Sequence, residues 1–116
     1  MSASIEFDHR DSVGIARLNG DVDITQASVL REQLLGAVRN DDIGLVVDLT
    51  DARYVDSVGV SLLFELAERL SGRQLRFAVV VPPEGLVERV LTIVDLKSVA
   101  EVHRDLNEAL TALRRG

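Results

Sequence analysis

Cysteine and tryptophan are absent from this chain of 116 residues, and its aromatic residues are three Phe and one Tyr. Without cysteine there is no disulfide, no thiolate nucleophile and no zinc site built on thiolates. The shortage of aromatic rings removes the stacking platforms on which proteins bind single-stranded nucleic acid. These absences exclude several classes of site before any motif is considered.

Positive charge is also scarce, because 13 basic residues stand against 19 acidic ones and give a net charge of −6. An acidic protein binds a phosphate backbone poorly and is repelled by an anionic membrane surface. No apolar run approaches the roughly 20 residues of a membrane span, and the start of the chain lacks the pattern of a secretory signal. We therefore expect a cytoplasmic protein with no nucleic-acid partner and no membrane insertion.

The hydrophobic pattern alternates between strand-like and helix-like segments after an opening hairpin. Strands are expected at residues 5–9, 13–18, 43–49, 75–81 and 99–103. Helices are expected at residues 26–39, 58–70, 84–94 and 106–113. This order predicts a single α/β domain over residues 1–116, with a mixed four- to five-stranded sheet and about four helices.

A strand, a tight connection and a helix start follow one another between residues 43 and 70. The pair Asp56-Ser57 stands where this helix begins. A helix start has unpaired N–H groups and positive potential, so it suits a capping hydroxyl, a carboxylate or a phosphate. The spacing predicts Ser57 as the N-cap. Because sites in such sheets form beyond the strands' carboxyl ends, residues 20–23, 54–59 and 82–85 are expected to meet there.

Two motifs carry a resemblance to a known family. The first is Gly20-Asp21-Val22-Asp23, and the second is the later turn Asp56-Ser57-Val58-Gly59. Together with the apolar strand between them, they resemble the STAS domain of bacterial anti-sigma-factor antagonists. The likeness covers nearly the whole chain and implies the STAS fold.

The resemblance implies a switch that depends on binding. Such an antagonist binds an anti-sigma factor of the serine kinase type and thereby releases a sigma factor. The kinase phosphorylates a hydroxyl in the Asp-Ser turn, the complex separates, and a phosphatase restores the antagonist. The usual phosphoacceptor directly precedes the glycine, where this chain has Val58. In related stressosome subunits the modified residue directly follows the aspartate, so Ser57 is the candidate phosphoacceptor.

The same resemblance implies a partner-binding surface, in which Val58 is an apolar residue that faces the partner. For the two glycines, the expected roles are a turn with positive φ at Gly20 and a close backbone approach at Gly59. The residues expected to contact the partner are Gly20, Asp21, Asp23, Tyr54, Asp56, Ser57, Val58, Gly59 and Val60.

Other interpretations remain open at this point. A STAS accessory subunit of a transporter or stressosome-like assembly needs no phosphorylation, which suits Val58. The acids Asp21, Asp23 and Asp56 could bind Mg²⁺ if they converge. Together with Lys97 they could also form a site like that of a receiver domain. The commonest explanation of such acids is that they are solvated residues in loops. Neither His9 nor His103 has another metal-ligating residue at the spacing that a metal site needs. No catalytic residue, cofactor or metal is predicted, the protein is not expected to be an enzyme, and the oligomeric state is left open.

Overall fold

The computed structural model describes residues 4–22 and 27–115, which contain six strands and four α-helices. The strands are β1 Ser4–Arg10, β2 Val13–Val22, β3 Gly44–Asp48, β4 Ala52–Val55, β5 Arg76–Val80 and β6 Glu101–His103. The helices are α1 Ala27–Gly36, α2 Ser57–Gly72, α3 Leu86–Ile93 and α4 Leu106–Arg114, with a 3₁₀ turn, η2, at Leu96–Ser98. The predicted α/β class is confirmed.

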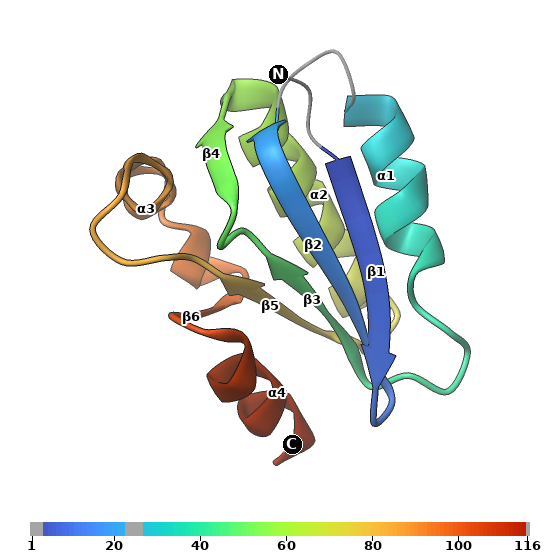
Figure 1. Ribbon diagram of the computed structural model, residues 1–116. Coiled ribbons are helices and arrows are strands. Elements are labelled where there is room, and N and C mark those ends of the chain that lie inside the picture. Colours follow the sequence, from blue (N-terminus) through green and yellow to red (C-terminus); the bar gives the residue numbers. More distant parts are fainter. Residues whose placement is uncertain (1–3, 23–26, 116) are drawn as a thin grey trace.

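One mixed sheet organises the molecule (Figure 1). Its main path runs β1-β2-β3-β5-β6, with β1 antiparallel to β2 and the other neighbours parallel. The short strand β4 lies off this path and pairs in parallel with the end of β2, beyond β3. The opening hairpin turns through Asp11 and Ser12, which have φ of 49° and 67°. Two consecutive positive φ values are those of a type I′ turn, whose twist matches its strands.

Strand β2 differs from the prediction because it continues to Val22 instead of ending at Leu18. Gly20 has a φ of 88°, and the register between β2 and β4 shifts between Gly20 and Asp21. The glycine that suggested a loop therefore sits at a bulge, which bends a strand without ending it. This extension of β2 is the part that pairs with β4.

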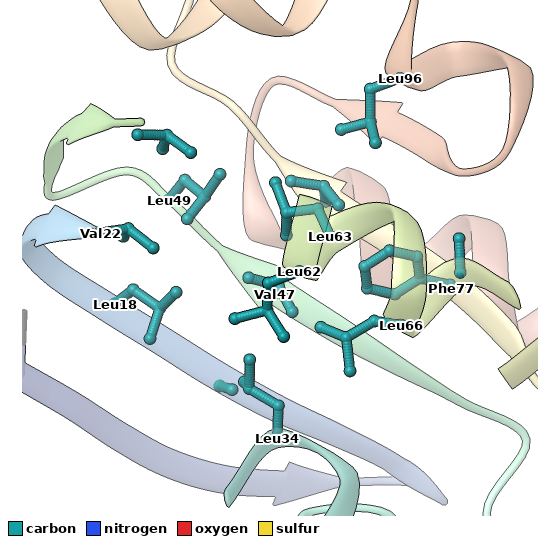
Figure 2. Packing of buried hydrophobic residues seen from close by; sticks show 14 of the residues in the cluster. Leu18, Val22, Leu34, Val47, Leu49, Leu62, Leu63, Leu66, Phe77 and Leu96 are labelled. Atoms are coloured by element: carbon teal, nitrogen blue, oxygen red, sulfur yellow. The ribbon is translucent and has the colours of Figure 1, made fainter. Parts of the chain in front are cut away.

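The core has two parts, one on each face of the sheet. The larger part packs α1, α2 and α3 against one face, and Figure 2 shows Leu18, Val47 and Leu66 at its centre. The smaller part packs α4 against the other face. The residues of α2 that are buried are Gly59, Leu62, Leu63, Leu66, Ala67 and Leu70. Helix α2 contacts both the sheet and α1, and its Val60 and Phe64 are only partly buried.

His9 lies on the edge strand β1 and pairs with a buried carboxylate. Its Nε2 lies 2.6 Å from Oδ1 of Asp42, whose side chain is fully buried. The backbone N–H of Arg39 donates to the other oxygen, Oδ2, at 2.7 Å. The Arg39 guanidinium lies 3.4 Å from His9 Nδ1 and has only donors, so Nδ1 accepts and Nε2 donates to the carboxylate. The contact ties β1 to the segment between α1 and β3.

Replacing His9 with alanine is expected to lower the free energy of unfolding by about 2 kcal/mol, because it removes a hydrogen bond to a buried charged group. Urea unfolding at pH 7 measures this change. The matched control is Arg10→Ala on the same strand, since Arg10 pairs with the exposed Asp8 and such pairs contribute less than about 1 kcal/mol. Equal losses in the two variants would contradict a special role for His9.

Candidate partner-binding surface at the start of helix α2

The pairing of β2 with β4 brings together two of the segments that the sequence singled out. Asp21 lies opposite Tyr54, and Val22 lies opposite Val55. The backbone N–H of Asp56 then donates to the Val22 carbonyl oxygen at 3.1 Å, which fixes the start of α2 beside the end of β2. Two of the three expected loops therefore meet, although through strand pairing rather than as loops.

The third expected segment, residues 82–85, leads into α3, which packs against β4. Asp23, which was predicted as a contact residue, lies outside the described residues. The described part of the surface consists of Gly20, Asp21, Tyr54, Asp56, Ser57, Val58, Gly59 and Val60, and is called the α2-start surface below.

The sequence indicated Ser57 as the N-cap of α2, but in the structure the N-cap is Asp56. Asp56 has extended backbone angles, φ −86° and ψ −177°, and its Oδ1 accepts the Gly59 N–H at 2.8 Å. Both residue types cap helices well, and the helix begins one residue earlier than predicted, which makes Ser57 its first residue. Ser57 is exposed, and its hydroxyl does not cap the helix, because its neighbour Asp56 does.

Gly59 is required by the close contact between α2 and the two strands. A Cβ at this position would lie 2.8 Å from Cγ1 of Val55 and 2.9 Å from the carbonyl oxygen of Val22. Both distances are far shorter than real Cβ contacts, and the second involves backbone that cannot rotate away. The predicted close approach at Gly59 is therefore confirmed, and so is the positive φ predicted at Gly20.

The α2-start surface combines exposed and half-buried side chains. Tyr54 is 43% exposed and Ser57 is exposed, whereas Val58 is half-buried and Val60 packs partly against the core. The two described acids of this surface also make defined contacts. Asp21 forms an ion pair with Arg53 at 3.4 Å, and Asp56 holds the first turn of α2 through its cap.

Two exposed apolar residues of α3 were not singled out by the sequence analysis. Leu86 is 52% exposed and Ile93 is 82% exposed, and both belong to α3, the helix against β4. They are seven residues apart and so lie on one face of the helix, away from the buried Val87 and Leu91. The sequence contained a signal for their exposure, because the helical period places Leu86 and Ile93 off the face that carries Val87 and Leu91.

The described residues contain no group of three or more histidines and acids placed to hold a metal ion. The Mg²⁺ interpretation also required Asp23, which is outside the described part. No helix among the described residues is both long and apolar enough to cross a membrane.

Comparison with known proteins places this geometry in a family. The model of the STAS domain matches residues 4–109. The anti-sigma-F factor antagonist RsfB of Mycobacterium tuberculosis is 28% identical over 115 residues, which cover 99% of this chain and 93% of the relative. The crystal structure of an anti-sigma factor antagonist from Mycobacterium paratuberculosis superposes with a TM-score of 0.87 at 26% identity, covering 97% of this chain and 95% of the other.

A more distant structure shares the fold. The phosphorylated form of the Bacillus cell fate determinant SpoIIAA has a TM-score of 0.69 at 16% identity, with 95% of this chain and 99% of that chain covered. The receiver interpretation loses its basis, because the family match extends over nearly the whole chain. The chain belongs to the STAS domain family.

Proposed function

We propose that this protein is an anti-sigma-factor antagonist, which binds an anti-sigma factor in the cytoplasm and so releases a sigma factor for transcription. The observation that carries the proposal is likeness along nearly the full chain to the Mycobacterium antagonists. The alternative, an accessory subunit of a transporter or stressosome-like assembly, is not favoured, because both of these relatives are antagonists. The proposed activity is binding and needs no catalytic residue or cofactor.

The anti-sigma factor is proposed to dock on the α2-start surface. Tyr54 and Ser57 are exposed there, and the half-buried Val58 and Val60 add apolar area. An apolar area of this kind with charged residues at its margin is typical of a protein-binding surface. Asp21 and Asp56 lie at the margin of the surface, where Asp21 is paired with Arg53 and Asp56 caps α2.

Ser57 is proposed as the residue that a kinase-type anti-sigma factor phosphorylates. It is the sole hydroxyl in the turn Asp56-Ser57-Val58-Gly59, it is exposed, and it does not serve as the cap. A phosphate adds a charge of about −1.5 to −2, which the positive end of α2 tolerates. The same charge beside Asp56 opposes a partner selected for the unmodified surface. Phosphorylation would then end binding without unfolding the domain.

The test is to add the purified protein to the complex of its cognate anti-sigma factor with the sigma factor. Size-exclusion chromatography should show a new complex with the anti-sigma factor and free sigma factor; an unchanged original complex would contradict the proposed function. With ATP, mass spectrometry should find one phosphate on Ser57 and none in Ser57→Ala. Binding without any phosphate on Ser57 would remove the kinase switch and leave the antagonist function standing.

A further inference from the structure

A cavity of about 180 Å³ lies beside α3, at the edge of the sheet opposite β1 (Figure 1). It is placed beyond the carboxyl ends of the parallel strands β5 and β6, because Val81 and Arg104, which directly follow these strands, both line it. Ligands of open α/β sheets bind beyond the carboxyl ends of the strands. Since a cavity of about 150 Å³ can hold benzene, this one has room for a molecule of roughly six to nine heavy atoms.

The buried part of the cavity wall is apolar. Val81, Leu91 and Leu96 are 3%, 4% and 1% exposed, and the partly buried Val102 of β6 completes this part of the wall. Aliphatic side chains offer water no hydrogen-bond partners, and a buried water needs about two to four of them. The inner end of the cavity is therefore suited to an aliphatic group of a ligand.

Helix α3 contributes a wall that carries acids. The residues of this wall are spaced by three and four along the chain, so they share one face of α3 and the turn that follows it. They are Glu88, Leu91, Thr92 and Asp95. The Oε1 atom of Glu88 accepts the backbone N–H of Glu84 at 2.9 Å, which engages this acid within its own helix start. Asp95 is thus the acid of this wall that a ligand can pair with.

Asp95 has an unusual backbone conformation. Its φ is 58° and its ψ is 52°, in the left-handed region that glycine adopts most easily and aspartate tolerates. It precedes the 3₁₀ turn η2 at the N-cap position, but its side chain makes no capping hydrogen bond. No ion pair or hydrogen bond among the described residues involves this carboxylate. Helix capping therefore does not account for an acid here, and the carboxylate is available to the cavity.

The wall formed by η2 and the end of β6 carries two cations. Lys97 and Arg104 both line the cavity and are exposed, and no ion pair or side-chain hydrogen bond of the described residues involves either of them. His103 also lines the cavity, but its Nε2 lies 3.7 Å from the Glu101 carboxylate. The cavity thus combines an apolar inner wall with one carboxylate and two cations that have no partner among the described residues.

We propose that this cavity binds a free aliphatic α-amino acid of the size of valine or leucine. The branched side chain lies against the buried apolar wall, the ammonium group pairs with Asp95, and the carboxylate pairs with Arg104 and Lys97. Charge-assisted hydrogen bonds of this kind are about twice as strong as neutral ones. A ligand with a single charge would match only one of the two charged walls. The site shares no residue with the α2-start surface, and its test needs no anti-sigma factor.

The test is an NMR titration of the ¹⁵N-labelled full chain with L-leucine up to about 10 mM. Saturable shift changes are expected at the amides of α3, η2 and β6. Isocaproate lacks the ammonium group of leucine and isoamylamine lacks its carboxylate, and each should bind at least about tenfold more weakly. Glycine, which has no side chain, should cause no such shifts. Equal binding of isocaproate and L-leucine, or shift changes confined to other elements, would overturn the proposal, as would the absence of saturable shifts.

Matched variants assign the charged groups. Asp95→Asn keeps the shape of the side chain and suits the positive φ, so the fold should be kept. It should weaken L-leucine by about tenfold or more and leave isocaproate unchanged, whereas equal losses for both ligands would contradict the pairing of Asp95 with the ammonium group.

Arg104→Gln tests the carboxylate end and should weaken both L-leucine and isocaproate. Its control is Arg89→Gln, because Arg89 is an exposed residue of α3 outside the cavity lining, and this variant should bind both ligands normally. If Arg89→Gln and Arg104→Gln weakened L-leucine equally, general charge attraction would suffice and the proposed site would be wrong.

Discussion

Replacing Ser57 with glutamate should weaken binding to the anti-sigma factor by about 100-fold or more, an effect equivalent to a few kcal/mol of binding free energy. The new carboxylate would lie in the first turn of α2, where the helix N-terminus stabilises it. In the complex it would lose water and stand beside Asp56, and like charges brought together at an interface cost several kcal/mol. Calorimetric titration measures the affinity, and urea unfolding shows whether the fold is kept.

The control for charge alone is Ser71→Glu, because Ser71 is an exposed residue near the other end of the same helix. It changes the net charge by the same amount and should leave the affinity within about threefold, since exposed charges far from an interface are screened by salt. Ser57→Ala should also bind normally, because its hydroxyl does not cap the helix. Equal affinity of Ser57→Glu and Ser71→Glu would remove Ser57 from the proposed interface.

The parts of the fold that sequence predicted well are those set by local pattern. The apolar runs of β3 and β5 and the amphipathic stripes of the helices follow from burial on the sheet. Strand β4 was missed because it has only four residues, two of them exposed, and pairs with an extension of β2. That extension depends on the bulge at Gly20, and a glycine after a strand more commonly marks its end.

The start of α2 also shows that local sequence pattern does not decide the role of each single residue. The pattern placed the helix start one residue too late, because Asp56 and Ser57 are adjacent and both suit the cap. Their roles are decided by the hydrogen bond from the Asp56 N–H to Val22, a contact between distant segments. The outward face of α3 and the pair His9–Asp42 also depend on tertiary packing. Local pattern therefore located the segments that meet at the start of α2, and tertiary contacts decided which residue caps the helix.

Replacing Gly59 with valine is expected to lower the free energy of unfolding by about 3 kcal/mol, the upper range for overpacking a core contact. Its Cβ would come within 3 Å of both Val55 and the Val22 carbonyl oxygen, so α2 must move away from the strands. That movement would also separate Ser57 from the end of β2. Anti-sigma factor binding should therefore fall even at temperatures where the variant is folded. Urea unfolding and calorimetric titration measure the two effects.

Gly72, at the other end of α2, provides the matched control. A Cβ there would have no atom within 4 Å, and Gly72 is a helical residue without positive φ. Gly72→Ala is thus expected to be neutral or to stabilise by up to about 1 kcal/mol, since alanine restricts the unfolded chain. If Gly59→Val unfolded at the same urea concentration as Gly72→Ala, the start of α2 would tolerate displacement. The close contact with β2 and β4 could then not be what holds the binding surface in place.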